Sequence, residues 1–442
     1  MDILFANAIL VTMDEELRML PTAYLGVTEG KISYIGKQPP KEQPGQIIDA
    51  SGMALMPGLI NCHAHLAGSL FRGYADGWNE ENRRWLYQAE EKLDGKSVKA
   101  ATLLSLAECL RFGVTSVSDL YYFTDEVAEA VAESGIKANL ARCATLFDPE
   151  EEEFDVENDP GCAELYRLTE KWHGYDNGRI RIDAGILSPA TSNFHLWEAM
   201  VGYAGEKELG FQLHLTENPQ EAADCEERYG LRPAELLDCH GAFKAGATVA
   251  GLSGLQKEDM ALLARRGATA VACPLAEANL GQSAPDVLEM AKAGLNVALG
   301  TGSPAEGAMD LFAVMRAAVQ KSRLLSGDCM ALPAPAALML ATVCGAKAQH
   351  RQKQCGMLKV GMDADVILVD FTAPHLMPCH NVLTSLVHSA SGSDVALTMV
   401  QGKILYQSGK FTTIHLENVV HGLSEHALPR IFGQEKGKET ES

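Results

Sequence analysis

The sequence predicts an α/β fold, a (β/α)8 barrel of the TIM type joined to a small β-sandwich domain that is built from both termini. Two observations support this fold class. Segments typical of strands and helices alternate over about 300 residues in the middle of the chain, and short strand-like segments gather at both ends. A doubly wound open sheet is the structural alternative, but no G-x-G-x-x-G motif follows an early strand.

Short apolar segments with strand character occupy the two ends of the chain. They are 3–11, 23–27, 31–36, 361–370 and 397–406. Glu29-Gly30 is a turn signal between two of them and predicts a hairpin. We therefore predict that residues 1–56 and 356–428 form the β-sandwich domain, that 57–355 form the barrel, and that 429–442 are a polar tail.

The middle of the chain alternates between strand and helix patterns. Residues 99–111 and 125–134 have helical composition, and Gly113 and Gly135 lie just past their ends, where helices commonly stop. The strand candidates are 115–119, 137–144, 180–186, 211–215, 247–250, 268–273 and 296–300. Because a helix-length segment separates each strand from the next, we expect the strands to be parallel.

Composition and charge exclude several classes of function. With 47% hydrophobic and 21% charged residues, the chain has the composition of a globular protein. Its net charge of −21 argues against a nucleic-acid partner. We found no signal-peptide pattern and no apolar run of about 18 residues, so we expect no membrane association and a cytoplasmic protein. The 11 cysteines form no C-x-x-C pair, which is typical of reduced thiols.

The most informative motif is His63-Ala64-His65, at the end of an apolar segment that follows Pro57-Gly58. Side chains alternate along a strand, so the two histidines point to the same side. Two imidazoles on one side of a strand end can bind one metal ion. A pair of surface histidines is the alternative for a bare H-x-H motif, but the preceding Pro-Gly and apolar run favour a metal site.

Several motifs together resemble the amidohydrolase superfamily, and within it the branch of S-adenosylhomocysteine/methylthioadenosine deaminases and chlorohydrolase-like aminohydrolases. The segments that carry the resemblance are 57–65, 70–76, 112–122, 214–217, 299–301, 360–370 and 389–394. They extend over nearly the whole chain. The family fold is a (β/α)8 barrel with a β-sandwich from both termini, which agrees with the prediction from the residues.

This resemblance implies a hydrolase of non-peptide C–N bonds with one divalent metal, zinc by preference, at the C-terminal mouth of the barrel. The metal lowers the pKa of a bound water. By the same resemblance, His63, His65 and His214 are metal ligands, and Glu217 is the catalytic residue that passes a proton to a ring nitrogen. The implied substrate is a small molecule such as a nitrogen heterocycle, and we also expect a homo-oligomer.

Four positions depart from the family pattern. Gly251 stands where the family has a histidine on the sixth strand, and Gly302 stands where it has the aspartate on the eighth. Leu187 and Ala272 replace two further histidines. The metal site is therefore depleted relative to the family, and if this gap is the whole defect, a histidine at 251 together with an aspartate at 302 should raise metal affinity.

Two functional hypotheses follow from these departures. One is an active C–N hydrolase with a rearranged or weakened site. The other is a catalytically inactive amidohydrolase-like protein with a role in binding or assembly. Glu306 and Asp310 follow Gly302. Asp310 suits a helix N-cap, whereas Glu306 is a candidate to fill the gap.

Overall fold

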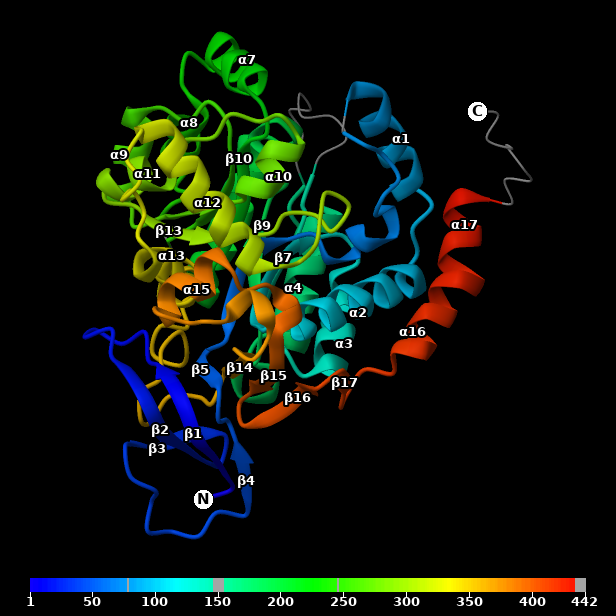
Figure 1. The fold of residues 1–442 in the computed structure, drawn as a ribbon. Coiled ribbons are helices and arrows are strands. Elements are labelled where there is room, and N and C mark those ends of the chain that lie inside the picture. The colour runs from blue at the N-terminus through cyan, green and yellow to red at the C-terminus, as the bar shows by residue number, and fades with distance from the viewer. Residues whose placement is uncertain (78, 146–154, 245, 434–442) are drawn as a thin grey trace, which may run out of the picture.

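Eight parallel strands form a barrel at the centre of the molecule (Figure 1). The computed structural model describes residues 1–77, 79–145, 155–244 and 246–433. The barrel strands are β6 Leu59–Ala64, β7 Val114–Tyr121, β8 Lys137–Arg142, β9 Ile180–Gly185, β10 Phe211–Thr216, β11 Thr248–Leu252, β12 Thr269–Ala272 and β13 Asn296–Leu299. Each pairs with the next in chain order, and a bridge from Ala64 to Gly302 brings the chain after β13 back to β6. The predicted barrel is confirmed.

Helices lie between the barrel strands in the sequence and cover the outside of the barrel. Those between β6 and β13 are α1 Glu80–Glu90, α2 Gly95–Arg111, α3 Thr124–Ser134, α4 Pro160–Trp172, α5 Tyr175–Gly178, α6 Phe194–Lys207, α7 Pro219–Tyr229, α8 Pro233–Cys239, α9 Lys257–Arg265, α10 Pro274–Asn279 and α11 Val287–Lys292. Those after β13 are α12 Leu311–Ser326, α13 Ala334–Leu340, α14 Val343–Ala348 and α15 Val382–His388. Local signals set their ends: the Asp94 side chain caps α2 by accepting from the Ser97 N–H, and Gly135 ends α3 with a φ of 85°.

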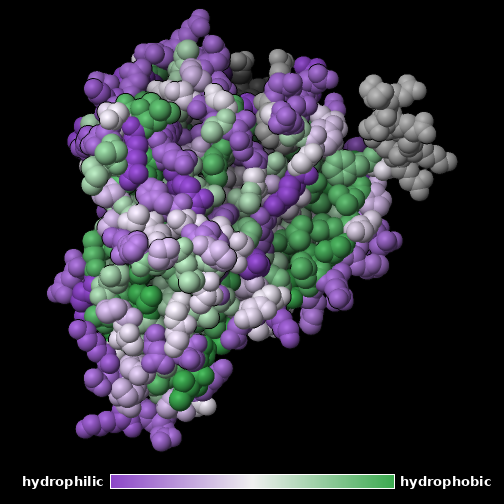
Figure 2. Space-filling view, in the orientation of Figure 1, coloured by the Kyte–Doolittle hydropathy of each residue, from purple (hydrophilic) through white to green (hydrophobic). Residues whose placement is uncertain are grey.

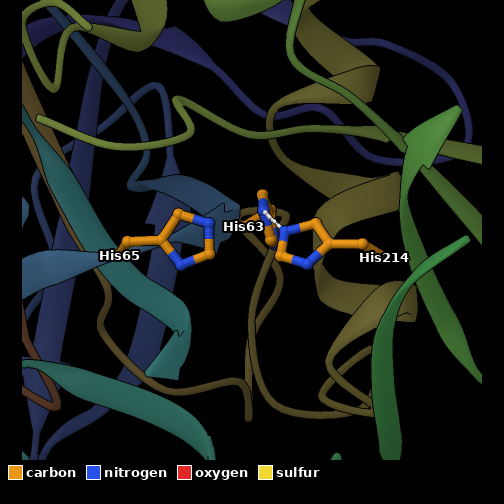
Figure 3. Close-up of side chains that lie close together, drawn as sticks. All are labelled: His63, His65 and His214. Atoms are coloured by element: carbon orange, nitrogen blue, oxygen red, sulfur yellow. Dashed lines mark hydrogen bonds between the residues drawn. The ribbon is translucent and has the colours of Figure 1, made fainter. Parts of the chain in front are cut away.

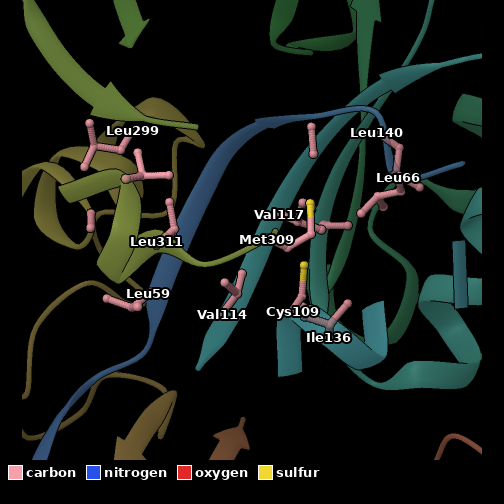
Figure 4. Packing of buried hydrophobic residues seen from close by; sticks show 14 of the residues in the cluster. Leu59, Leu66, Cys109, Val114, Val117, Ile136, Leu140, Leu299, Met309 and Leu311 are labelled. Carbon is pink, nitrogen blue, oxygen red and sulfur yellow. The ribbon is translucent and has the colours of Figure 1, made fainter. Parts of the chain in front are cut away.

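One continuous apolar cluster joins the barrel strands to the surrounding helices (Figure 4). Leu59 of β6, Val117 of β7 and Leu140 of β8 belong to it and are fully buried. Every residue of β6 and of β7 is buried, as expected for parallel strands that are covered on both faces. Each large aliphatic side chain in this cluster contributes about 1.5–3 kcal/mol, so this core fixes the strand ends that carry the histidines.

Both termini contribute strands to a second, mixed sheet, seen below the barrel in Figure 1. Its strands are β1 Ile3–Val11, β2 Met19–Thr28, β3 Lys31–Gly36, β4 Gln46–Asp49, β5 Met53–Pro57, β14 Val366–Asp370, β15 Val395–Val400, β16 Lys403–Gln407 and β17 Lys410–Phe411. Antiparallel pairing of β5 with β14, in which Leu55 faces Leu368, joins the two ends of the chain. The sheet has its own apolar core, so the predicted second domain from both termini is confirmed.

A buried ion pair connects the barrel to this second domain. Lys137 of β8 has no exposed side-chain surface, and its Nζ donates to Asp363 at 2.7 Å and also to Asp365. Burial acts to lower the pKa of Lys137, but the two carboxylates outweigh it and leave the pKa raised. The lysine therefore stays charged, and its loss would leave Asp365 without a cation, whereas Asp363 would keep its ion pair with Lys31 at 2.8 Å.

The C-terminal segment differs from the prediction of a polar tail that begins at residue 429. Helices α16 Leu416–Gly422 and α17 Leu428–Phe432 flank a π-helical segment, Leu423–Ala427, and α16 packs against α2. Ile431 is buried, and the Phe432 ring stacks on Trp85 with 5.6 Å between centroids. These apolar contacts hold the chain in place up to Phe432, and the rest of the predicted tail, 434–442, lies outside the described residues.

Hydrophobic residues gather on the surface over α16 and α17 (Figure 2). Leu416 and Val420, one helical turn apart on α16, are 38% and 48% exposed. In the part of the chain that the structure describes, no helix is both long enough and apolar enough to cross a membrane.

Candidate metal centre

The three predicted histidines lie together at the C-terminal ends of the barrel strands (Figure 3). His63 is in β6, His65 comes directly after β6, and His214 is in β10. Their ligand nitrogens all lie within 4.8 Å of one another, and the ring centroids are 4.8–5.2 Å apart. The alternation along β6 brings His63 and His65 to one side, and β10, four strands from β6 in the barrel order, brings His214 to them from across the barrel.

Backbone carbonyl groups orient two of these rings. His65 Nδ1 donates to the Leu120 carbonyl at 2.7 Å, and His214 Nδ1 donates to the Leu187 carbonyl at 3.0 Å. The Nε2 atom of each ring is then left with its lone pair toward the group, as in histidines whose other nitrogen is fixed for metal binding. His63 Nε2 lies 3.1 Å from His214 Nε2.

Burial keeps all three rings neutral. It lowers the pKa of His65 and of His214 to about 4, and the pKa of His63 well below its ordinary value. A charged imidazolium loses hydration when it is buried, and neighbouring imidazoles oppose a second charge. Neutral imidazole is the form that binds a metal ion, so the group is prepared for a cation.

Glu217 follows the last residue of β10 and lines the same cavity as the histidines. Its backbone N–H donates to Glu221 Oε2 at 2.9 Å, which fixes the chain at this point. The cavity measures about 1230 Å³ including its part open to solvent, and among the described residues four glutamates and one arginine line it: Glu90, Glu217, Glu277, Glu306 and Arg83. A pocket with this balance of charge suits a neutral or cationic small molecule.

The two glycines at positions where the resemblance implies metal ligands, Gly251 and Gly302, have left-handed backbone conformations. Gly251 has a φ of +60°, and a Cβ there would lie 3.0 Å from the Thr216 carbonyl oxygen. Gly302 has a φ of +70°, and a Cβ there would lie 2.9 Å from the Ala276 Cβ. Side chains are strained at both positions, so a histidine at 251 and an aspartate at 302 would have to overcome this strain, and the gain in metal affinity from the two together stays a prediction.

The other two departures also lie in or beside the cavity wall. Leu187 lines the cavity, and its carbonyl orients His214 as described above. Ala272 ends β12 in the buried core, and the next residue, Cys273, lines the cavity. Neither side chain can form a hydrogen bond with a polar ring.

Residues that were not singled out from the sequence also shape the site. Asp119 of β7 accepts from the Leu66 N–H at 2.7 Å, and burial raises its pKa to about 7. This contact fixes the turn that follows His65. The sequence contained a signal for Asp119, because this residue belongs to segment 112–122, one of the segments that carry the resemblance. The strand formed by this segment also lies next to the H-x-H strand. In addition, Tyr121 donates to Glu90 Oε1 at 2.5 Å in the cavity wall.

Comparison with known proteins places the chain in a family. Residues 54–405 match the family model described as Amidohydrolase family. A 5'-deoxyadenosine deaminase from Methanosarcina mazei is 36% identical over 95% of this chain and 96% of its own length. A 5-methylthioadenosine/S-adenosylhomocysteine deaminase from Thermoanaerobacter pseudethanolicus is 32% identical over 97% and 99%.

Solved structures agree with this result. The crystal structure of an adenosine deaminase from Xanthomonas campestris with bound zinc superimposes with a TM-score of 0.90, at 26% identity, and covers 98% of each chain. The resemblance drawn from the motifs is confirmed, and the chain belongs to the amidohydrolase family.

Proposed function

We propose that this protein is a metal-dependent hydrolase that cleaves a non-peptide C–N bond of a small nitrogen heterocycle. The observation that carries this proposal is the group of three buried, neutral imidazoles at the barrel mouth, two of them fixed through Nδ1. Membership of the amidohydrolase family and relatives named as deaminases support it.

The donor set fits a divalent ion of the zinc type. His63, His65 and His214 would hold it, because neutral imidazole nitrogens are common zinc ligands and three of them leave a position open for water. When bound, the ion would lower the pKa of that water and polarise the substrate. Glu217, which lines the same cavity, would carry a proton to and from a ring nitrogen.

The substrate class is inferred from the names of the relatives and from two departures from the family pattern, Leu187 and Ala272. The relatives are named for 5'-deoxyadenosine, 5-methylthioadenosine and S-adenosylhomocysteine, so aminated purines are the first molecules to try. Leu187 and Ala272 replace histidines of the family pattern, and they lower the capacity of this site to hydrogen-bond a polar nucleoside. We therefore expect smaller aminated heterocycles to be better substrates than adenine nucleosides.

A second candidate function is supported by Gly251 and Gly302. A protein without these two family ligands would be a depleted, catalytically inactive member that binds a ligand or assembles with a partner. Gly251 and Gly302 are compatible with both candidate functions. Only a measurement of the activity of the metal-loaded protein distinguishes the active hydrolase from the inactive protein. A cytoplasmic location and a homo-oligomeric state stay predictions.

The test combines metal analysis with a substrate screen. Purified protein is loaded with zinc, its metal content is measured by mass spectrometry, and ammonia release is followed with aminopurines and aminopyrimidines. We expect one zinc ion per chain and measurable release, and loss of both in a His65→Ala variant. Stoichiometric zinc without release from any compound would favour the inactive candidate.

A further inference from the structure

The loop after β13 brings the carboxylate of Glu306 close to residue 302, where the resemblance implies an aspartate. Gly302 is next to the metal-binding group, because its N–H donates to the His63 carbonyl at 3.2 Å and it bridges to Ala64. By the resemblance, this position carries the residue that takes a proton from water. In this chain the position has no side chain, so the proton acceptor must come from elsewhere if the site is active.

Glu306, four residues further along the chain, is close enough to fill this space. The Glu306 N–H donates to the Ser303 carbonyl at 3.0 Å, and this turn folds the chain back toward Gly302. Its Oε2 lies 3.1 Å from the point where a Cβ at residue 302 would be. Glu306 and Gly302 both line the cavity of the three histidines. The missing side chain at 302 and the position of the Glu306 carboxylate are thus complementary, since a side chain at 302 would crowd that carboxylate.

The charged groups around Glu306 leave its carboxyl available for proton transfer. In the described ranges, no lysine, arginine or histidine forms an ion pair with it, whereas Glu277 in the same wall pairs with Lys321 at 2.9 Å. Burial raises the pKa of Glu306 to about 7, and the negative charge of Glu217 acts in the same direction. The Ser303 backbone and Arg83 act against this rise. A carboxyl group that titrates near neutral pH is suited to accept and return a proton.

We propose that Glu306 is the proton acceptor of this site and replaces the family's eighth-strand aspartate from a neighbouring turn. This inference rests on the proposed function. It adds a catalytic residue that the motif pattern does not contain, and it explains how an amidohydrolase with a glycine at position 302 can keep its chemistry.

The proposed step balances for the hydrolysis of an amino group on a ring carbon. An O–H bond of water breaks, its proton moves to the Glu306 carboxylate, and the oxygen bonds to the ring carbon. Glu217 gives a proton to the adjacent ring nitrogen. The C–N bond then breaks as Glu306 returns its proton to the amino group, which leaves as ammonia. The remaining hydroxyl proton passes to Glu217, and a ring carbonyl is left.

The test compares the full-length native protein with Glu306→Gln, which keeps the shape of the side chain but cannot accept a proton. Glu289→Gln makes the same change on the exposed surface of α11 and serves as the matched control. The first readout needs no substrate: calorimetric zinc titration at about pH 6, in two buffers with different ionisation enthalpies, counts the protons released on binding. A nearby cation favours the ionised carboxylate, so the native and control proteins should each release nearly one proton more than Glu306→Gln.

The second readout is turnover of whichever heterocycle the screen identifies. Loss of a general base lowers the rate by about 10²–10⁴-fold, so kcat of Glu306→Gln should fall in that range while the control keeps native kcat. Equal proton release by native protein and Glu306→Gln, or turnover that survives this change, overturns the assignment and leaves the proposed function intact. Failure of the native protein to bind zinc overturns the proposed function, and the assignment with it.

Discussion

Adding a single methyl group at residue 302 should destabilise the protein, whereas the same addition five residues later should not. At Gly302 the φ of +70° places an alanine in the left-handed region, which costs about 1–2 kcal/mol. The new Cβ would also lie 2.9 Å from the Ala276 Cβ, and overpacking of this kind costs about 1–3 kcal/mol. Gly302→Ala should therefore lower the free energy of unfolding by about 2–5 kcal/mol.

Gly307→Ala is the matched control. The nearest atom to a Cβ at residue 307 is Asn279 Nδ2 at 4.0 Å, so the methyl group enters open space. We expect this variant to stay within about 0.5 kcal/mol of the native protein. Equilibrium urea unfolding of the three metal-free proteins, followed by tryptophan fluorescence, gives the comparison. Equal stability of Gly302→Ala and Gly307→Ala would refute the strain and contact argument.

The same reasoning extends to Gly302→Asp, which introduces the residue that the resemblance implies at a position with a φ of +70°. This variant should be destabilised like Gly302→Ala, and its zinc affinity should not exceed that of the native protein. An increase in zinc affinity of tenfold or more, measured by competition with a chelator, would show that the loop can relax and that the left-handed conformation does not limit the site.

Three further predictions concern pH, the domain contact and assembly. Acid should destabilise the metal-free protein, because the pKa of His214 is about 4 when folded and 6.5 when unfolded, so the unfolded chain binds more protons between these values. His214→Asn should thus reduce the dependence of unfolding free energy on pH in that window by about 1.4 kcal/mol per unit, and an unchanged slope in urea unfolding would contradict this. Lys137→Met leaves the buried Asp365 without its cation and should cost about 3–5 kcal/mol in urea unfolding at neutral pH, and a loss below about 1 kcal/mol would contradict the role of this ion pair. Light scattering should show that the native protein is a homo-oligomer. If the exposed apolar residues of α16 form the interface between subunits, Val420→Lys should shift the protein toward the monomer. A native protein that is monomeric would disprove the prediction.

Much of the fold could be predicted from local patterns. The alternation of apolar strand segments with helix-length segments indicated the barrel, and Gly135 marked the end of α3 within the sequence itself. The helical end of the chain was missed because 429–442 is polar in composition. Two apolar residues, Ile431 and Phe432, suffice to attach it to α1 and the core, and composition does not show where such residues dock.

The candidate site could be predicted only in part. Strand alternation relates His63 to His65, whereas His214 is 149 residues beyond His65, and only the resemblance connected the two. The backbone conformations at Gly251 and Gly302 could not be predicted, since glycine adopts positive and negative φ with similar ease. Glu306 was visible as a nearby carboxylate, but its approach to residue 302 depends on a turn that the sequence does not specify.

The most direct test of the central claim is the release of ammonia by the zinc-loaded protein from an aminated heterocycle, measured before and after removal of the metal with a chelator. We predict turnover that disappears when zinc is removed and returns when zinc is restored, because the three histidines would hold the ion that activates water. A protein that retains one zinc ion per chain but releases no ammonia from any aminopurine or aminopyrimidine would contradict the claim.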